Sequence, residues 1–149
     1  MGARRGVIPW VAGLGLALCA LGPAGAGAVG AGFVVLVNQA NPVASISRSE
    51  LKRLATGETK QWSSGAVVHL GIIPSDAPET KYLASLFDMS TRELLARIQE
   101  QVFKGELRRP AVLRSSTDCV AFARSSAGAL CIASGDEPVP PEAHVVVLH

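Results

Sequence analysis

The apolar, mostly β-branched run Phe33–Val37 constrains the fold of this chain more than any other feature. Such a run is typical of a strand that is buried on both faces of a parallel sheet, because it has no polar face to turn toward water. Asn38, Asn41 and Pro42 then break the run with turn-forming residues. The sequence therefore predicts a central strand with protein packed against both of its faces.

A short helix is predicted directly after this strand. Ser47 and Glu50 have the Ser-x-x-Glu spacing of a capping box, in which each side chain binds the other residue's backbone N–H. Leu51 and Leu54 give the helix an apolar face, and Gly57 is expected to end it in the left-handed conformation.

A second apolar run, residues 67–73, follows this helix. Together with the first strand and the helix it predicts a βαβ unit, in which a right-handed crossover joins two parallel strands. His69 lies inside the run, and we interpret it as a packed residue and not as a catalytic base.

Three more helix starts are predicted further along the chain. Asp76 and Glu79 repeat the capping-box spacing around Pro78, and Ser90 and Glu93 repeat it again. A last helix is expected after 115–118, with Gly128 at its C-terminus, and strands are expected at 129–133 and 145–148, with a short extended piece at 111–113.

Six short motifs follow one another between residues 33 and 133. They are Val37-Asn38, Asn41-Pro42-Val43, the helix 47–55, Gly57, the Trp-Ser-Ser-Gly of 62–65 and the Ser-Ala-Gly-Ala-Leu of 126–130. Their order and spacing resemble those of the phosphate-type periplasmic solute-binding proteins of ABC transporters. In that family Val-Asn, Asn-Pro-Val, a short helix, Gly and Trp follow each other, and a Pro-Gly-Ala-Ile-Gly-Tyr segment comes later. The resemblance implies an α/β fold. We expect a single lobe of a type II periplasmic-binding-protein-like fold, with a small mixed β-sheet flanked by helices.

The same resemblance points to the turn between 73 and 81 as the ligand-binding loop. In the family, this turn carries an arginine and a Ser-Gly-Thr that hold the anion with side chains and helix N-terminal amides. Here both are missing, and Asp76 and Glu79 would repel an anion. By position, the candidate ligand-binding residues are Ser75, Thr80, Lys81 and Asn38.

Residues 1–28 have the layout of a secretory signal peptide, with Arg4 and Arg5, an apolar run at 7–21 and small residues at 24–28. We therefore expect 29–149 to form one periplasmic-binding-protein-like domain, periplasmic or secreted, with no membrane span in the mature chain. A retained signal anchor is the alternative. Lipid anchoring at Cys19 is not expected, because Leu18 stands where a lipoprotein box needs a small residue.

The charge balance and the cysteine content bear on what the domain is expected to bind. Removal of Arg4 and Arg5 leaves 12 basic and 12 acidic residues, and a neutral domain of this kind is not expected to bind nucleic acid. Cys119 and Cys131 remain as a candidate disulfide, and two buried thiols are the alternative. The histidines lack metal-ligand spacing with either cysteine, so neither a metal nor a cofactor is predicted.

No nucleophile with a base and no acid–base pair has convincing spacing, so no catalytic residue is predicted. We expect a non-enzymatic solute-binding-like domain that binds phosphate or another small anion for an ABC transport system. Its partner would be the transporter or a periplasmic protein. A ligand-free protein-interaction module derived from the same fold is the alternative, and an exported enzyme is the third hypothesis.

Overall fold

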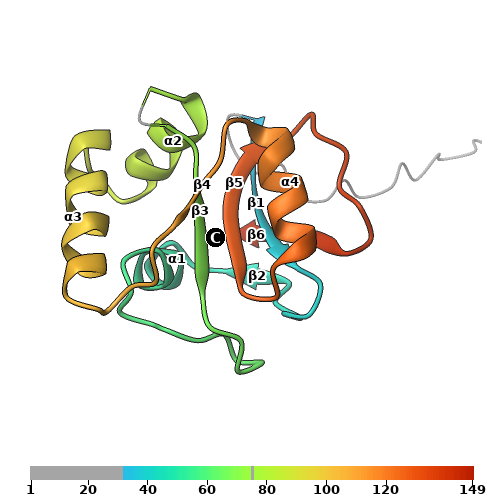
Figure 1. The fold of residues 1–149 in the computed structure, drawn as a ribbon. Helices are drawn as coiled ribbons and strands as arrows, with labels where there is room; N and C mark the ends of the chain where they lie inside the picture. Colours follow the sequence, from blue (N-terminus) through green and yellow to red (C-terminus); the bar gives the residue numbers. More distant parts are fainter. Residues whose placement is uncertain (1–31, 75) are drawn as a thin grey trace, which may run out of the picture.

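The computed structural model describes residues 32–74 and 76–149, so the expected signal peptide, Cys19 and Ser75 lie outside the described residues. In this part of the chain the elements follow one another as shown in Figure 1. They are β1 (Phe33–Asn38), β2 (Ser45–Ile46), α1 (Arg48–Ala55), β3 (His69–Ile72), α2 (Pro78–Leu86), α3 (Thr91–Phe103), β4 (Ala111–Val112), α4 (Ser116–Ser125), β5 (Ala129–Ser134) and β6 (Ala143–Leu148). No described helix has both the length and the apolar character needed to cross a membrane.

The six described strands form one mixed sheet in the order β2-β6-β1-β5-β3-β4. β1 is antiparallel to both of its neighbours, β5 and β6. β3 is parallel to β5 and to β4, and β2 is parallel to β6. β1 thus runs against the other five strands. The mixed sheet with flanking helices confirms the expected α/β class.

The predicted βαβ unit is wrong. β5 lies between β1 and β3, with Val35 opposite Ile132 and Leu70 beside Leu130. β1 is also antiparallel to its neighbours, although its sequence was interpreted as that of a strand in a parallel sheet. An apolar run indicates that both faces of the strand are buried, and this holds for a central antiparallel strand as well as for a parallel one. The run therefore carries no information about strand direction.

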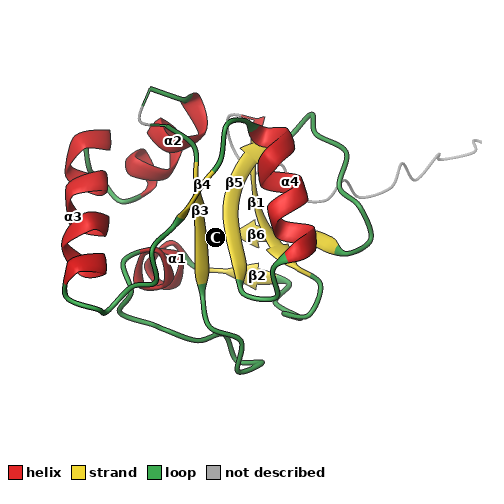
Figure 2. Cartoon of the chain, in the orientation of Figure 1, coloured by secondary structure: helices red, strands yellow, loops and turns green. Residues whose placement is uncertain are grey.

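Helices cover both faces of the sheet (Figure 2). Val35 and Val37 of β1 face the larger core with α1, α2 and α3, whereas Leu36 faces a smaller core with α4. All three side chains are fully buried. This alternation follows from the two-residue period of a strand, and it explains why β1 has no polar face.

Two of the predicted capping boxes are confirmed. At the start of α1, Ser47 and Glu50 bind each other's backbone N–H groups, and Ser90 and Glu93 do the same at the start of α3. Gly57 has a φ of +80° just after α1, as expected for a residue that ends a helix in the left-handed region.

The predicted role of Gly128 is wrong. α4 ends at Ser125, and its C-cap is Ser126 in an extended conformation. A Cβ on Gly128 would lie 1.7 Å from the carbonyl oxygen of Val67, so only glycine allows the two backbones to approach here. The Gly128 carbonyl accepts hydrogen bonds from Trp62 Nε1 at 3.0 Å and from the His69 N–H at 2.8 Å.

A disulfide joins α4 to the sheet. It connects Cys119 of α4 with Cys131 of β5, and their Cα atoms are 6.1 Å apart, within the range that a disulfide spans. Both residues are buried in the smaller core. The cross-link therefore holds α4 against a central strand.

Candidate functional site

The candidate site is the edge of the sheet where α2 and α4 begin. α2 follows β3 and α4 follows β4, and these two strands are parallel, so both helices start at the carboxyl ends of their strands (Figure 1). In open α/β sheets, ligands bind outside the carboxyl ends of the strands. Helix N-termini there add unpaired N–H groups and a partial positive charge.

At the start of α2, the predicted capping box of Asp76 and Glu79 is wrong. The N-cap is Ala77, which makes no side-chain cap, and Pro78 occupies the first turn. The Glu79 carboxylate instead accepts a hydrogen bond of 2.5 Å from the Ser116 hydroxyl of α4. The tertiary fold brings that hydroxyl within reach, and it takes the place of the local backbone amide.

Ser116 connects three elements at this edge. Its Oγ donates to Glu79 of α2 and accepts a 2.7 Å hydrogen bond from the N–H of Ser134, the last residue of β5. Ser116 is 6% exposed, so this hydroxyl is largely shielded from water. It is an internal link between α2, α4 and β5.

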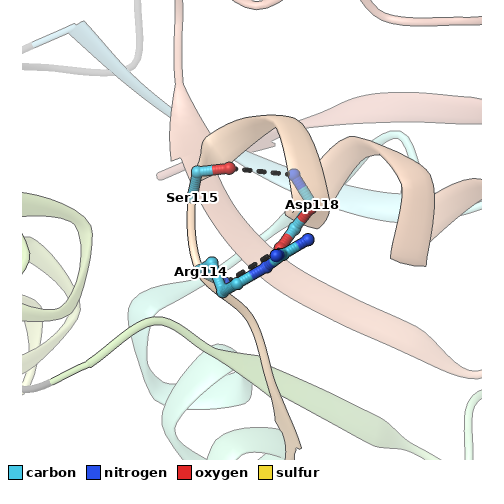
Figure 3. Close-up of polar contacts among 3 residues, drawn as sticks. All are labelled: Arg114, Ser115 and Asp118. Atoms are coloured by element: carbon cyan, nitrogen blue, oxygen red, sulfur yellow. Dashed lines mark hydrogen bonds and ion pairs between the residues drawn. The ribbon is translucent and has the colours of Figure 1, made fainter.

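The start of α4 carries its own carboxylate (Figure 3). Asp118 Oδ2 accepts hydrogen bonds of 3.1 Å from both the backbone N–H and the Nε of Arg114, and the Asp118 N–H donates to Ser115 Oγ. The hydrogen bonds and the charge of Arg114 lower the pKa of the Asp118 carboxyl. Asp118 is therefore ionised at neutral pH and neutralises the exposed guanidinium of Arg114.

Both helices at this edge begin with a carboxylate. Glu79 and Asp118 lie in the first turns of α2 and α4, where negative charge interacts favourably with the helix dipole. A phosphate at the same place would lose part of that attraction and would meet two like charges. The arrangement therefore opposes the capture of a free anion by the amides of these helices.

Two of the sequence-predicted ligand residues make structural contacts. Thr80 is 2% exposed, and its hydroxyl donates a 2.6 Å hydrogen bond to the carbonyl of Ile73. The Asn38 amide donates to the carbonyls of Ala123 and Arg124 at the end of α4, at 2.8 and 3.1 Å. Both side chains hold backbone segments together, and their donors are already used.

The other two predicted residues are placed differently. Lys81 is exposed on α2, and none of the ion pairs found among residues 32–74 and 76–149 includes it. Ser75 lies outside the described residues. The structure thus brings together Glu79, Ser116 and Ser134, a cluster that sequence reasoning missed. No sequence signal could have found it, because Ser116 and Glu79 are 37 residues apart.

One serine–histidine contact bears on the enzyme hypothesis. Ser126 Oγ lies 3.5 Å from His69 Nδ1, at the upper limit for a hydrogen bond. The His69 ring packs edge-on against Phe122 with ring centroids 4.9 Å apart. Burial and the charge of Arg108 lower the pKa of His69. Among the described residues, no carboxylate hydrogen-bonds to this imidazole, so the orienting third group of a catalytic triad is missing.

Metal binding is not supported in the described part of the chain. Within residues 32–74 and 76–149, no group of three or more His, Cys, Asp and Glu side chains is arranged to hold a metal ion. The two cysteines outside the N-terminal segment form the disulfide.

Comparisons with known proteins identify the fold. The sequence matches no protein-family model and no curated protein. Solved structures do match. An ABC-type phosphate transport receptor from Vibrio cholerae superimposes with a TM-score of 0.54 and 16% identity, over 78% of this chain and 46% of the receptor.

A second solved structure gives the same result. It is a putative phosphate ABC transporter substrate-binding protein from Clostridium perfringens with bound phosphate. It matches with a TM-score of 0.52 and 17% identity, over 78% of this chain and 44% of that protein. The chain thus has the α/β fold seen in phosphate-type substrate-binding proteins of ABC transporters, and it spans less than half the length of the two structures that it matches.

Proposed function

We propose that this chain is an exported, non-enzymatic binding domain of the solute-binding-protein type whose ligand is a partner protein and not free phosphate. One observation carries the proposal: the Glu79 carboxylate accepts a hydrogen bond from Ser116 at the start of α4. The edge of the sheet where a ligand of this fold class would bind is therefore already occupied by a negatively charged side chain of the protein itself.

The non-enzymatic part of the proposal is supported by the same region. Catalysis needs reacting groups that are held in mutual geometry and supported by further groups. The Ser126–His69 contact lacks an orienting carboxylate in the described residues, and Ser126 is the C-cap of α4. The matched structures are a transport receptor and a substrate-binding protein.

Binding of a small anion is the second candidate function. It is favoured by the matched Clostridium perfringens structure, which contains phosphate. In this chain the anion would need Arg114 to leave Asp118 and Ser116 to leave Glu79. Besides Arg114, Lys81 of α2 would be a second cation available to the anion. The two candidates therefore make opposite predictions about phosphate.

Isothermal titration calorimetry with phosphate, and with sulfate as the matched anion, separates them. The wild-type protein is expected to give no saturable heat with either anion at millimolar concentration. The double variant Glu79→Gln with Asp118→Asn removes both like charges, so its phosphate affinity is expected to become measurable, with a gain of about tenfold or more. Glu93→Gln is the control, because it removes a first-turn carboxylate from α3. Saturable one-to-one binding of phosphate by the wild-type protein would overturn the proposal.

Export is tested separately. If residues 1–28 are a signal peptide, the protein recovered from the periplasm of an expressing bacterium starts at Val29. Intact-mass spectrometry of that fraction measures the start directly. Recovery of the full-length chain from the membrane fraction would instead indicate a retained signal anchor.

A further inference from the structure

The free edge of β4 lies beside an apolar groove that borders α3. We propose that this edge and groove bind an extended segment of a partner protein, which pairs with β4 as an added strand, inserts an apolar side chain into the groove and places a carboxylate beside Arg109. The inference rests on the proposed protein-binding function, and it names the class of partner.

Among residues 32–74 and 76–149, β4 is the last strand of the sheet, and β3 is its neighbour on one side. The N–H of Leu113 donates a 2.8 Å hydrogen bond to the carbonyl of Ile72. Backbone groups alternate in direction along a strand, so those of Val112 point away from β3. An outward N–H and C=O on an edge strand form a template for another strand.

The groove beside this edge has a volume of about 320 Å³. Leu95, Ile98 and Val102 line it from α3, and Val112 lines it from β4. The Val112 side chain is 80% exposed, and Phe103, next in the chain after Val102, is 93% exposed. Val112 thus adds an exposed apolar side chain to an apolar groove at the strand edge, and a contiguous apolar surface of this kind is typical of a binding site.

Charge identifies the partner's chemistry. Among the described residues that line the groove, Arg109 is the one that carries a charge, and Arg108 precedes it. None of the ion pairs in the described part of the chain includes either arginine. An apolar groove with a guanidinium at its border is complementary to an apolar segment that carries Asp, Glu or a C-terminal carboxylate, since Arg binds carboxylates with two parallel hydrogen bonds.

A second copy of this chain is the less suitable occupant. Two β4 edges related by a two-fold axis pair antiparallel, so a pair centred on Val112 sets Arg109 of each copy opposite Ser115 of the other, and the arginine meets no carboxylate there. Pro110 just before β4 has no N–H to donate, which limits the pairing of a longer strand. The edge therefore suits a segment that brings its own carboxylate better than it suits a second copy.

Fluorescence anisotropy with short labelled peptides tests the proposal. The probe is an eight-residue peptide in which valine and threonine alternate and one central threonine is replaced by aspartate. The comparison peptide has lysine at that place. The purified protein is expected to bind the aspartate peptide saturably below 1 mM, and to bind the lysine peptide at least tenfold more weakly.

Three variants localise the binding. Arg109→Glu is expected to reverse the preference so that the lysine peptide binds more tightly, and Val112→Asp is expected to abolish binding of the aspartate peptide. Arg97→Glu is the matched control, because it makes the same charge change on α3 outside the groove. Circular dichroism melting of each variant confirms that the fold is kept.

Hydrogen exchange distinguishes strand pairing from a purely electrostatic contact. An electrostatic contact with Arg109 would not protect the Val112 amide. Peptide binding as an added strand is expected to slow exchange of the Val112 amide at least tenfold. No saturable binding of the aspartate peptide, or binding that Arg97→Glu weakens as much as Arg109→Glu, would overturn the inference. A wild-type dimer that Val112→Asp dissociates would assign the edge to a second copy and would also overturn it. Phosphate calorimetry is independent of these results, so failure here leaves the proposed function separately testable.

Discussion

The Ser116 hydroxyl lies 2.5 Å from the carboxylate of Glu79, and this hydrogen bond ties the first turn of α4 to the first turn of α2. The contact places a negative charge of the protein at the edge of the sheet where a ligand is expected for this class of fold. The hydrogen bond is therefore expected to stabilise the fold and to disfavour binding of a free anion at this edge. The phosphate titrations described above test the second expectation.

Ser116→Ala is expected to lower the free energy of unfolding by about 2 kcal/mol. The substitution leaves the Ser134 N–H and the Glu79 carboxylate without the hydroxyl that now pairs both. Urea denaturation followed by tryptophan fluorescence measures the change. Thr117→Ala is the control, because Thr117 is exposed and its hydroxyl donates a 3.2 Å hydrogen bond to Glu137 at the surface. Equal effects of the two substitutions would contradict the prediction.

Reduction of the Cys119–Cys131 disulfide is expected to lower the free energy of unfolding by about 3 kcal/mol, because the cross-link closes a short loop and limits the unfolded chain. Urea denaturation with and without dithiothreitol measures this difference. In the Cys119→Ser, Cys131→Ser double variant, dithiothreitol is expected to have no effect. Equal stability of the oxidised and reduced wild-type protein would show that the cross-link adds nothing.

Protonation of His69 is expected to lower the stability of the folded protein in mild acid. Burial and the charge of Arg108 lower its pKa in the folded protein below the ordinary value of 6.5. The unfolded chain therefore binds a proton more readily, and the His69 contribution weakens as the pH falls from about 7 through 6.5 and below.

His69→Gln removes this titration while it keeps a polar side chain at the same place. Urea denaturation at several pH values between 5.5 and 7.5 is expected to show a smaller loss of stability for the variant than for the wild-type protein. The lowered pKa values of Glu50, Glu93 and Asp118 act at lower pH and are shared by both proteins. Identical slopes between pH 7.5 and 5.5 would rule out His69 as the cause.

Trp62 is predicted to stabilise the fold mainly through packing. It is 5% exposed, and its Nε1 donates to the Gly128 carbonyl, which also accepts from the His69 N–H. Trp62→Ala is expected to cost about 4 kcal/mol through the cavity that it leaves. Trp62→Phe is expected to cost about 1 kcal/mol, since the carbonyl keeps its second donor. Thermal melts measure the loss of stability in both variants. Similar losses would show that the hydrogen bond of Trp62 contributes more to stability than its packing does.

Local features of the fold could be predicted from the sequence because their partners are close in the chain. The boxes Ser47/Glu50 and Ser90/Glu93 depend on residues three apart, and the apolar runs gave the central strands. The α/β class followed from the same patterns together with the resemblance.

The candidate site could not be predicted in the same way. Asp76 and Glu79 have the spacing of a capping box, yet Glu79 binds a hydroxyl 37 residues away. The local amide and the distant hydroxyl compete for one carboxylate, and only the packed positions of α2 and α4 decide between them. For the same reason, sequence position predicts Thr80 and Asn38 as ligand residues, whereas in the fold their donors bind backbone carbonyls.

What the sequence by itself determined is therefore the set of buried strands, most of the helix starts and the class of the fold. The tertiary structure alone decided the order and direction of the strands, because β5 inserts between β1 and β3 although it follows both of them in the sequence. It also decided the need for glycine at Gly128, where two backbones meet. Hydrophobic periodicity records which side chains leave water, whereas pairing between distant segments depends on the packing of the whole chain.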